Sequence, residues 1–273
     1  MYELGSARIR KGKKHVAQED SGGGTGGQQG TSMSLEDLRG FRILLTCAQV
    51  VGGILVLLVA IWTISYRGGF AWRSNPGLEF NWHPLLMTIG MIYLYGNGIL
   101  MYRTLRNMRK RSLKITHASV LFAAFALSSI GIIAAFDSHN LADPPKPNLY
   151  TLHSWFGIIT FTGFTLQWVG GLVTFLYPGL ASHIRAAALP VHMYFGLVLF
   201  IMACTSAVLG LAEKAIWTLG AQYASYVNEG LLMNQIGLLI FLFAFIVIYL
   251  VTHLPYKRQP RPEDENLLTG LSD

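Results

Sequence analysis

The strongest constraint on the fold is a series of six long apolar runs. They cover residues 41–66, 80–102, 115–136, 149–176, 188–212 and 231–254. A helix of about 20 mostly apolar residues can span a bilayer. Only 13% of the residues are charged, whereas soluble domains carry about a quarter. The sequence therefore predicts an all-α integral membrane protein that folds as a six-helix bundle in a lipid bilayer.

Polar segments at both ends divide the chain into three predicted parts. We expect a disordered tail over residues 1–38, which contains the flexible run SGGGTGGQQG, and a transmembrane domain over residues 39–256. A second polar tail follows over residues 257–273. The net charge of +7 does not indicate a nucleic-acid partner, because the basic residues lie at the edges of the apolar runs and in the tails.

The loop charges predict the orientation of the chain. With the N-terminus in the cytosol, 17 of the 21 lysine and arginine residues fall on the cytosolic side. The segment 103–114 alone contributes six of them. Because cytosolic loops of membrane proteins are enriched in these residues, we expect both termini to be cytosolic.

Four histidines lie inside predicted helices 2 to 5, one in each helix: His83, His117, His153 and His192. Ionisable residues at such depth are costly and mark functional sites by default. One of them alone is equally well explained by a hydrogen bond between helices, but four on successive helices are not. His83 and His153 lie near the outer ends of their helices, and the other two lie towards the cytosolic ends. The four therefore form two levels, each drawn from two parallel helices.

Two levels of paired histidines match the needs of two b-type haems, with helices 2–5 forming the haem-binding core. Each iron takes two imidazole nitrogens, which leaves no open position and suits electron transfer. The chain has no C-x-x-C-H motif, so the haems are predicted to be non-covalent. The glycines of these helices either allow close helix packing or make room for the porphyrins; they are Gly90, Gly96, Gly98, Gly157, Gly163, Gly170, Gly171 and Gly196.

The histidines and their flanks resemble the cytochrome b561 family of ascorbate-dependent transmembrane haem proteins. The matching motifs are NWHPL at 81–85, KITHA at 114–118, TLHSW at 151–155 and PVH at 190–192, with FDSHN at 136–140 and LYPG at 176–179. The resemblance covers residues 41 to 256 and is closest to animal members. Thr151 stands where the family usually has serine, which keeps a hydroxyl group.

The resemblance implies how the histidines pair and what the protein does. His83 and His153 would hold the outer haem, and His117 and His192 the cytosolic haem, which is the pairing that the depths give independently. Ascorbate would donate an electron to the cytosolic haem. The outer haem would then reduce ferric iron or monodehydroascorbate, which makes the protein a transmembrane oxidoreductase. The resemblance also implies a homodimer.

Basic side chains near the cytosolic haem are the candidates for binding the ascorbate anion. Lys114 lies three residues before His117, Lys110 a further turn back, and Arg185 seven residues before His192. Positive-inside topology alone explains cations here, but the resemblance favours a role in binding ascorbate. Tyr177 is a further candidate, with an ordinary place in the interfacial aromatic belt as its alternative.

On the outer side we expect an acceptor site that includes His139, Asn140 and Trp155. The first two are predicted to lie in the loop between helices 3 and 4, where a histidine is usually just solvated. The resemblance places that loop histidine near the outer haem. Trp155 follows His153 directly and either borders the acceptor site or packs against the porphyrin.

Two other functions remain compatible with the sequence alone. Intramembrane histidines also serve as relays in proton- or metal-coupled transporters, and a haem protein can anchor another oxidoreductase in the membrane. The tail sequence EDENLL at 263–268 fits an acidic dileucine sorting signal or a simple solvated tail. The predicted location is therefore an endosomal, lysosomal or secretory vesicle membrane, or the plasma membrane.

Overall fold

The structure, a computed structural model, describes residues 35–258 of the chain, and side chains from residue 37 onward. In chain order its helices are α1 (Leu35–Ile61), η1 (Trp62–Tyr66), α2 (Pro76–Glu79), α3 (Trp82–Met87), η2 (Thr88–Leu94), α4 (Tyr95–Thr104), α5 (Lys110–Asn140), α6 (Leu152–Phe175), α7 (Ser182–Leu219), η3 (Gly220–Ser225), α8 (Asn228–Thr252) and η4 (Leu254–Tyr256). Of the predicted tails, 1–34 and 259–273 lie outside the described residues.

Six helical segments are long and apolar enough to cross a membrane, and no strand occurs in the described part of the chain. They are Asp37–Tyr66, Pro76–Thr104, Lys110–Asn140, Leu152–Phe175, Ser182–Ser225 and Asn228–Thr252. This confirms the prediction of an all-α, six-helix membrane protein. Most of the helices extend beyond the predicted apolar runs, because polar residues continue the helix once it reaches the membrane surface.

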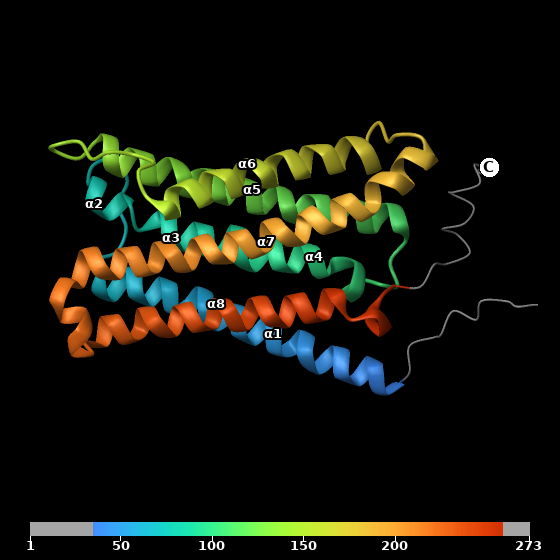
Figure 1. Cartoon of the computed structure of the whole chain (residues 1–273), viewed down its shortest axis with the longest axis horizontal. Helices are drawn as coiled ribbons and strands as arrows, with labels where there is room; N and C mark the ends of the chain where they lie inside the picture. The colour runs from blue at the N-terminus through green and yellow to red at the C-terminus, as the bar shows by residue number, and fades with distance from the viewer. Residues whose placement is uncertain (1–34, 259–273) are drawn as a thin grey trace, which may run out of the picture. The chain divides into compact units, whose positions relative to one another are not determined.

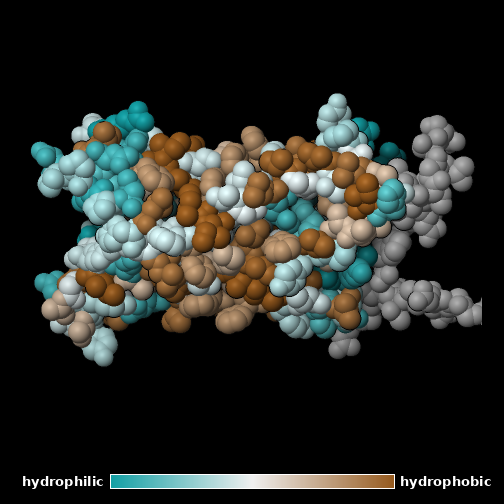
Figure 2. All heavy atoms as spheres, turned by 45° about the horizontal axis from the view of Figure 1, so that its top comes forward, coloured by the Kyte–Doolittle hydropathy of each residue, from teal (hydrophilic) through white to brown (hydrophobic). Residues whose placement is uncertain are grey.

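The six spans lie side by side and alternate in direction (Figure 1). One end of the bundle, which we call the basic end, carries the loops 105–109 and 176–181 and the end of α8. The other end, which we call the far end, carries the loops 67–75 and 141–151 and the short helix η3. Figure 2 shows hydrophobic residues over the middle of the visible face and hydrophilic ones towards the ends. This distribution matches a bilayer around the middle of the bundle.

Buried polar contacts fix the packing of the outer helices α1 and α8. At the far end, Glu229 of α8 accepts hydrogen bonds from Trp62 Nε1 at 2.9 Å and from Arg67 at 2.8 Å. At the basic end, Arg103 of α4 donates to the carbonyls of Val251 and His253, where α8 ends. A helix leaves its last carbonyls without partners, so these bonds from Arg103 stabilise the end of α8.

The second span changes its helical repeat close to one of the four histidines. Pro84 follows His83 and has no backbone N–H to donate, and the segment Thr88–Leu94 is π-helical. The hydroxyl of Thr88 donates to the Pro84 carbonyl at 2.7 Å. Single π-helical turns inside α-helices are often found at functional sites. This one adjoins the helix turn that carries His83.

Candidate functional site

The four intramembrane histidines form two facing pairs. The ring centres of His83 (α3) and His153 (α6) are 6.0 Å apart, and those of His117 (α5) and His192 (α7) are 6.4 Å apart. The carbonyl of Gly131, which contacts His83, lies fourteen residues after His117 on α5, which corresponds to about 21 Å along the helix. The structure therefore places the pairs at two separate levels of the bundle.

In three of the histidines, the Nδ1 atom faces a backbone carbonyl of another helix. The distances are 3.1 Å from His83 to Gly131, 2.8 Å from His117 to Gly98, and 2.8 Å from His153 to Ser206. A neutral imidazole that donates from Nδ1 keeps a free lone pair on Nε2. These three rings are therefore oriented by the backbone with Nε2 left for another partner.

His192 differs, because a side-chain amide holds it. Gln167 of α6 places its Nε2 3.0 Å from the Nδ1 of His192 and donates from the same nitrogen to the His192 carbonyl at 2.6 Å. The ring of Phe175 lies 5.2 Å from the His192 ring, centre to centre. His192 is thus fixed from α6 just as His153 is fixed from α7.

Two glycines bring a helix backbone against these rings. A Cβ atom at Gly210 would lie 2.5 Å from Cε1 of His153, and one at Gly171 would lie 2.8 Å from Cε1 of His192. By contrast, a Cβ at Gly170 would meet nothing within 4 Å. Gly210 was not singled out from the sequence, since glycines are common in membrane helices and nothing in the sequence tells which one faces a ring.

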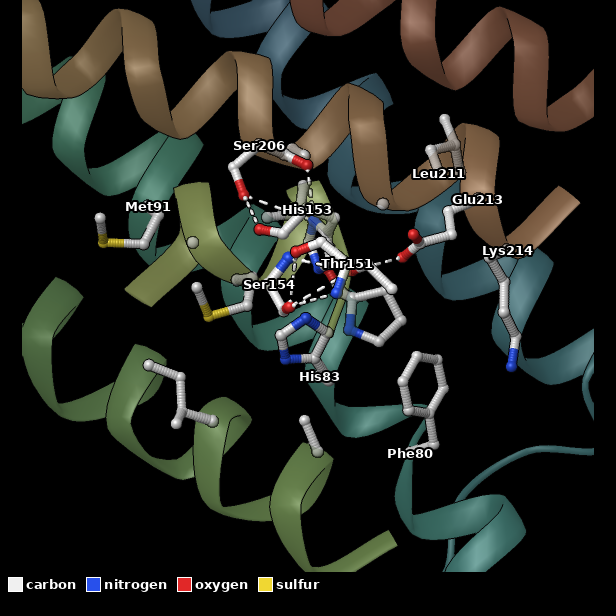
Figure 3. A pocket seen from close by; sticks show the side chains of 18 of the residues that line it. Phe80, His83, Met91, Thr151, His153, Ser154, Ser206, Leu211, Glu213 and Lys214 are labelled. Atoms are coloured by element: carbon white, nitrogen blue, oxygen red, sulfur yellow. Dashed lines mark hydrogen bonds between the residues drawn. The ribbon is translucent and has the colours of Figure 1, made fainter. Parts of the chain in front are cut away.

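The pair at the far end borders a cavity of about 210 Å³ (Figure 3). Its lining is mostly apolar. The polar groups that line it include His83, His139, Asn148, Thr151, His153, Ser154, Ser206, Glu213 and Lys214. A mostly apolar cavity with a few converging polar groups is the usual form of a cofactor or ligand site.

Two of the predicted acceptor-site residues lie in a helix and not in a loop. α5 continues to Asn140, so His139 and Asn140 occupy its last turn. The expected loop placement was wrong, because the amides of Leu141 and Ala142 donate to the carbonyls of Asp137 and His139 and close that turn.

Asn148, for which no sequence motif predicts a role, joins these two residues. Asn148 lies 3.1 Å from Nδ1 of His139 and donates to the side chain of Asn140 at 2.7 Å. His139 and Asn148 line the cavity, but Asn140 is exposed outside it. Trp155 also lies away from the cavity. Its side chain is 61% exposed, and its indole donates to the carbonyl of Leu149.

Glu213 and Lys214 of α7 also line the cavity, although the sequence does not predict them to belong to a site. The Thr151 hydroxyl donates to Glu213 of α7 at 3.2 Å, and Thr151 also caps the first turn of α6. The ammonium of Lys214 lies 4.1 Å from the centre of the Phe80 ring. Nothing in the sequence around Glu213 and Lys214 indicates a site, because single charged residues are common near the ends of membrane helices.

At the basic end, one of the four predicted anion-binding residues makes a contact close to His192. Lys114 Nζ donates to the carbonyl of Phe175 at 2.8 Å. Tyr177, two residues on, is 79% exposed. Lys110 begins α5 and Arg185 lies in the first turn of α7, and both side chains are partly buried. The structure therefore gathers all four at the end of the bundle that carries His117 and His192.

Other cations at the basic end have structural contacts. Arg106 lies over the Phe41 ring at 5.0 Å, and partial burial lowers the pKa of its guanidinium. Arg258 donates to the carbonyls of Arg106 and Met108. Arg106 thus packs the loop between α4 and α5 against α1, and Arg258 holds the same loop against the residues that follow α8.

Comparison with known proteins assigns the chain to a recognised group. The family described as Eukaryotic cytochrome b561 matches residues 82–218. The transmembrane ascorbate-dependent reductase CYB561 of Sus scrofa is 40% identical over 223 residues, which cover 81% of this chain and 86% of that protein. The human protein of the same name is 39% identical over 220 residues, with the same coverage. The plasma membrane ascorbate-dependent reductase CYBRD1 of Mus musculus is 36% identical over 233 residues, or 84% and 79% of the two chains.

Proposed function

Because this chain belongs to the cytochrome b561 family, we propose that it is a transmembrane oxidoreductase that takes electrons from ascorbate. The electrons pass to an acceptor on the opposite side of the membrane. The family implies b-type haem, and a bound haem iron supplies reversible one-electron transfer. The protein's part is to hold each iron, to set its depth in the membrane and to bind the small molecules at the two faces.

The histidine pairs are the proposed axial ligands of two haems. Two imidazole nitrogens bound at about 2 Å to one metal ion hold their ring centres about 6 Å apart. The separations of 6.0 and 6.4 Å fit this requirement. Since His83, His117 and His153 direct Nδ1 to backbone carbonyls, Nε2 is the atom that would bind iron. This spacing at two levels is the observation that carries the proposal.

We place the basic end in the cytosol. The loop charges favour this orientation, because lysine and arginine accumulate on the cytosolic side. His117 and His192 then face the cytosolic donor, His83 and His153 face the lumen or cell exterior, and both termini are cytosolic. An endosomal, lysosomal, secretory vesicle or plasma membrane is the proposed location, and a homodimer is the proposed assembly.

Ascorbate is an anion at neutral pH, so the basic end is its proposed entry. Lys110, Lys114 and Arg185 would attract it, and the exposed Tyr177 would contact it. On oxidation the ascorbate anion gives up one electron and one proton and becomes monodehydroascorbate.

At the far end, His139 and Asn140 would face the acceptor, and Asn148 holds both. The proposed acceptor is either ferric iron, which takes one electron, or monodehydroascorbate, which takes one electron and one proton.

Removing one ligand from each pair tests the assignment. His117→Ala should lose one of two haems per protein and should no longer transfer electrons from ascorbate, because the donor-side pair is broken. His83→Ala should lose the other haem and keep reduction by ascorbate. Haem content and absorbance spectra of the purified proteins are the measurements. Retention of both haems in either variant would show that the ligands are wrong, and a colourless wild type would favour a histidine-relay transporter.

Transport of electrons across the membrane needs a separate experiment. Proteoliposomes loaded with ascorbate should reduce ferric citrate or monodehydroascorbate outside, and the faster of the two identifies the preferred acceptor. Protein-free liposomes are the control for leakage. Equal rates with and without protein would refute the proposed function.

A further inference from the structure

The cavity at the far end contains a positive charge with no acidic partner. Across residues 37–258 the structure shows two ion pairs, Arg67–Glu229 and Arg73–Asp137, and Lys214 takes part in neither. Lys214 is partly buried and lines the cavity beside His83 and His153. Among the described residues that line this cavity, Lys214 is the one lysine, and none is an arginine.

The position of Lys214 is set by an aromatic ring. Its ammonium lies 4.1 Å from the centre of the Phe80 ring. The same ring lies 5.8 Å from the ring of His83, centre to centre. A cation over an aromatic face gains about 0.5–2 kcal/mol, which orients the side chain but leaves its charge in place. The Phe80 ring thus contacts the Lys214 ammonium and also lies next to the His83 ring.

The neighbouring carboxylate does not neutralise Lys214 by contact. Glu213 precedes it on α7, but one oxygen of Glu213 accepts a hydrogen bond from Thr151 at 3.2 Å. Successive residues of a helix point about 100° apart. Figure 3 shows Glu213 reaching towards Thr151, whereas the Lys214 side chain ends beside Phe80. The ammonium is therefore available to a bound anion.

We propose that Lys214 binds an oxyanion at the far-end cavity. A partly buried ammonium is stabilised by an oxyanion, and charge-assisted hydrogen bonds are the stronger kind. Two sources offer this chemistry next to His83: a carboxylate of the haem itself, or the carboxylate or enolate oxygens of an anionic electron acceptor. The inference deepens the proposed function and rests on it. It names Lys214 as the residue that selects or anchors the anion.

The test compares charge-removing variants with a matched control. Lys214→Met removes the charge and keeps the length of the side chain, and Lys214→Arg keeps the charge. Lys146→Met removes one charge from an exposed lysine of the 141–151 loop at the same end. Each protein is placed in proteoliposomes loaded with ascorbate. The external acceptors are ferric citrate, which is anionic, and hexaammineruthenium(III), which is cationic.

If Lys214 binds the acceptor, Lys214→Met should raise the KM for ferric citrate about tenfold, the effect of one lost charge-assisted hydrogen bond. The KM for hexaammineruthenium(III) should stay within about twofold, and Lys214→Arg should keep most of the affinity. Lys146→Met should change neither KM by more than about twofold, because an exposed charge contributes little.

If Lys214 binds a haem carboxylate, both KM values should stay unchanged in Lys214→Met. The midpoint potential of one haem and the resonance Raman band of its propionates should shift instead. Should Lys214→Met lose haem or fail to fold, Lys214→Gln is measured in its place. A variant equal to wild type in both KM values, in both potentials and in the Raman spectrum would overturn the proposal. Failure of the proposed function is distinct, because the wild type would then not reduce either acceptor.

Discussion

Replacing Gly210 by alanine tests whether close backbone approach sets the position of His153. In the structure an added Cβ would lie 2.5 Å from Cε1, 2.6 Å from Nδ1 and 3.0 Å from Nε2 of the His153 ring. Non-bonded carbon atoms rest at about 3.5–4.0 Å, so the ring must withdraw by about 1 Å. The Nδ1 of this ring is already held at 2.8 Å by the carbonyl of Ser206 on the same helix. The ring therefore cannot withdraw from α7 and keep that hydrogen bond.

The expected effect on haem binding is large, because metal–ligand bonds tolerate little displacement. A functional metal site keeps its ligand distances within about 0.2 Å of the ideal values, whereas the added methyl group demands about five times that shift. The lost hydrogen bond costs about 1 kcal/mol. Loss of a group that hydrogen-bonds to a metal ligand lowers the metal affinity by about 10–100-fold. We expect Gly210→Ala to purify with one haem, against the two proposed for the wild type.

Haem-to-protein ratio, measured by the pyridine haemochrome absorbance, is the assay. Gly171→Ala should have the same effect at the other pair, because its Cβ would lie 2.8 Å from Cε1 of His192. Gly170→Ala is the matched control, since nothing lies within 4 Å of its added Cβ, and it should keep both haems. Two haems in Gly210→Ala, with unchanged spectra, would refute the reasoning.

Three further predictions concern the contacts that hold the bundle and the proposed donor site. Glu229→Gln should lower the free energy of unfolding by about 1–3 kcal/mol, because it breaks a buried ion pair; Asp137→Asn, in an exposed pair, should cost less than about 1 kcal/mol. Thermal unfolding of both variants checks this. Lys114→Met should raise the KM for ascorbate severalfold, whereas Arg111→Met, an exposed control, should not; stopped-flow reduction of the haem measures both. Gln167→Leu should speed haem loss at the basic end about tenfold, because it removes the side-chain amide that holds His192, a proposed haem ligand. Transfer of haem to apomyoglobin follows that rate.

The six spans were predictable because the bilayer imposes a simple length and polarity requirement. The exact ends of the helices were not predictable from the same requirement. α5 continues through the polar run from Asp137 to Asn140, since a helix emerging from the membrane can expose polar side chains and still close its last turn. The apolar run that predicts this helix ends at residue 136, and the sequence therefore predicts a loop at His139.

The four histidines were predictable for the same physical reason, since ionisable side chains in a membrane are costly. Their partners were not, because Gly98, Gly131 and Ser206 use backbone carbonyls, which every residue possesses. Equally, Gly170 and Gly171 are adjacent in the sequence, but only the second faces a ring. Which residue does so depends on the rotation of each helix about its axis, and that is decided by packing.

The contacts of the histidines link helix packing to cofactor binding in a specific way. The bundle has two halves, one made of α3, α4 and α5 and the other of α6 and α7. In the first half, a carbonyl of α5 orients His83 and a carbonyl of α4 orients His117. In the second half, α7 orients His153 and α6 orients His192. Each facing pair, however, joins the two halves, α3 to α6 and α5 to α7. An iron between the rings of a pair would therefore connect halves that are already ordered internally. Binding would then need little rearrangement of the ligands. The cofactors would stabilise the contacts between the two halves, which join α5 to α6 and the second span to α7.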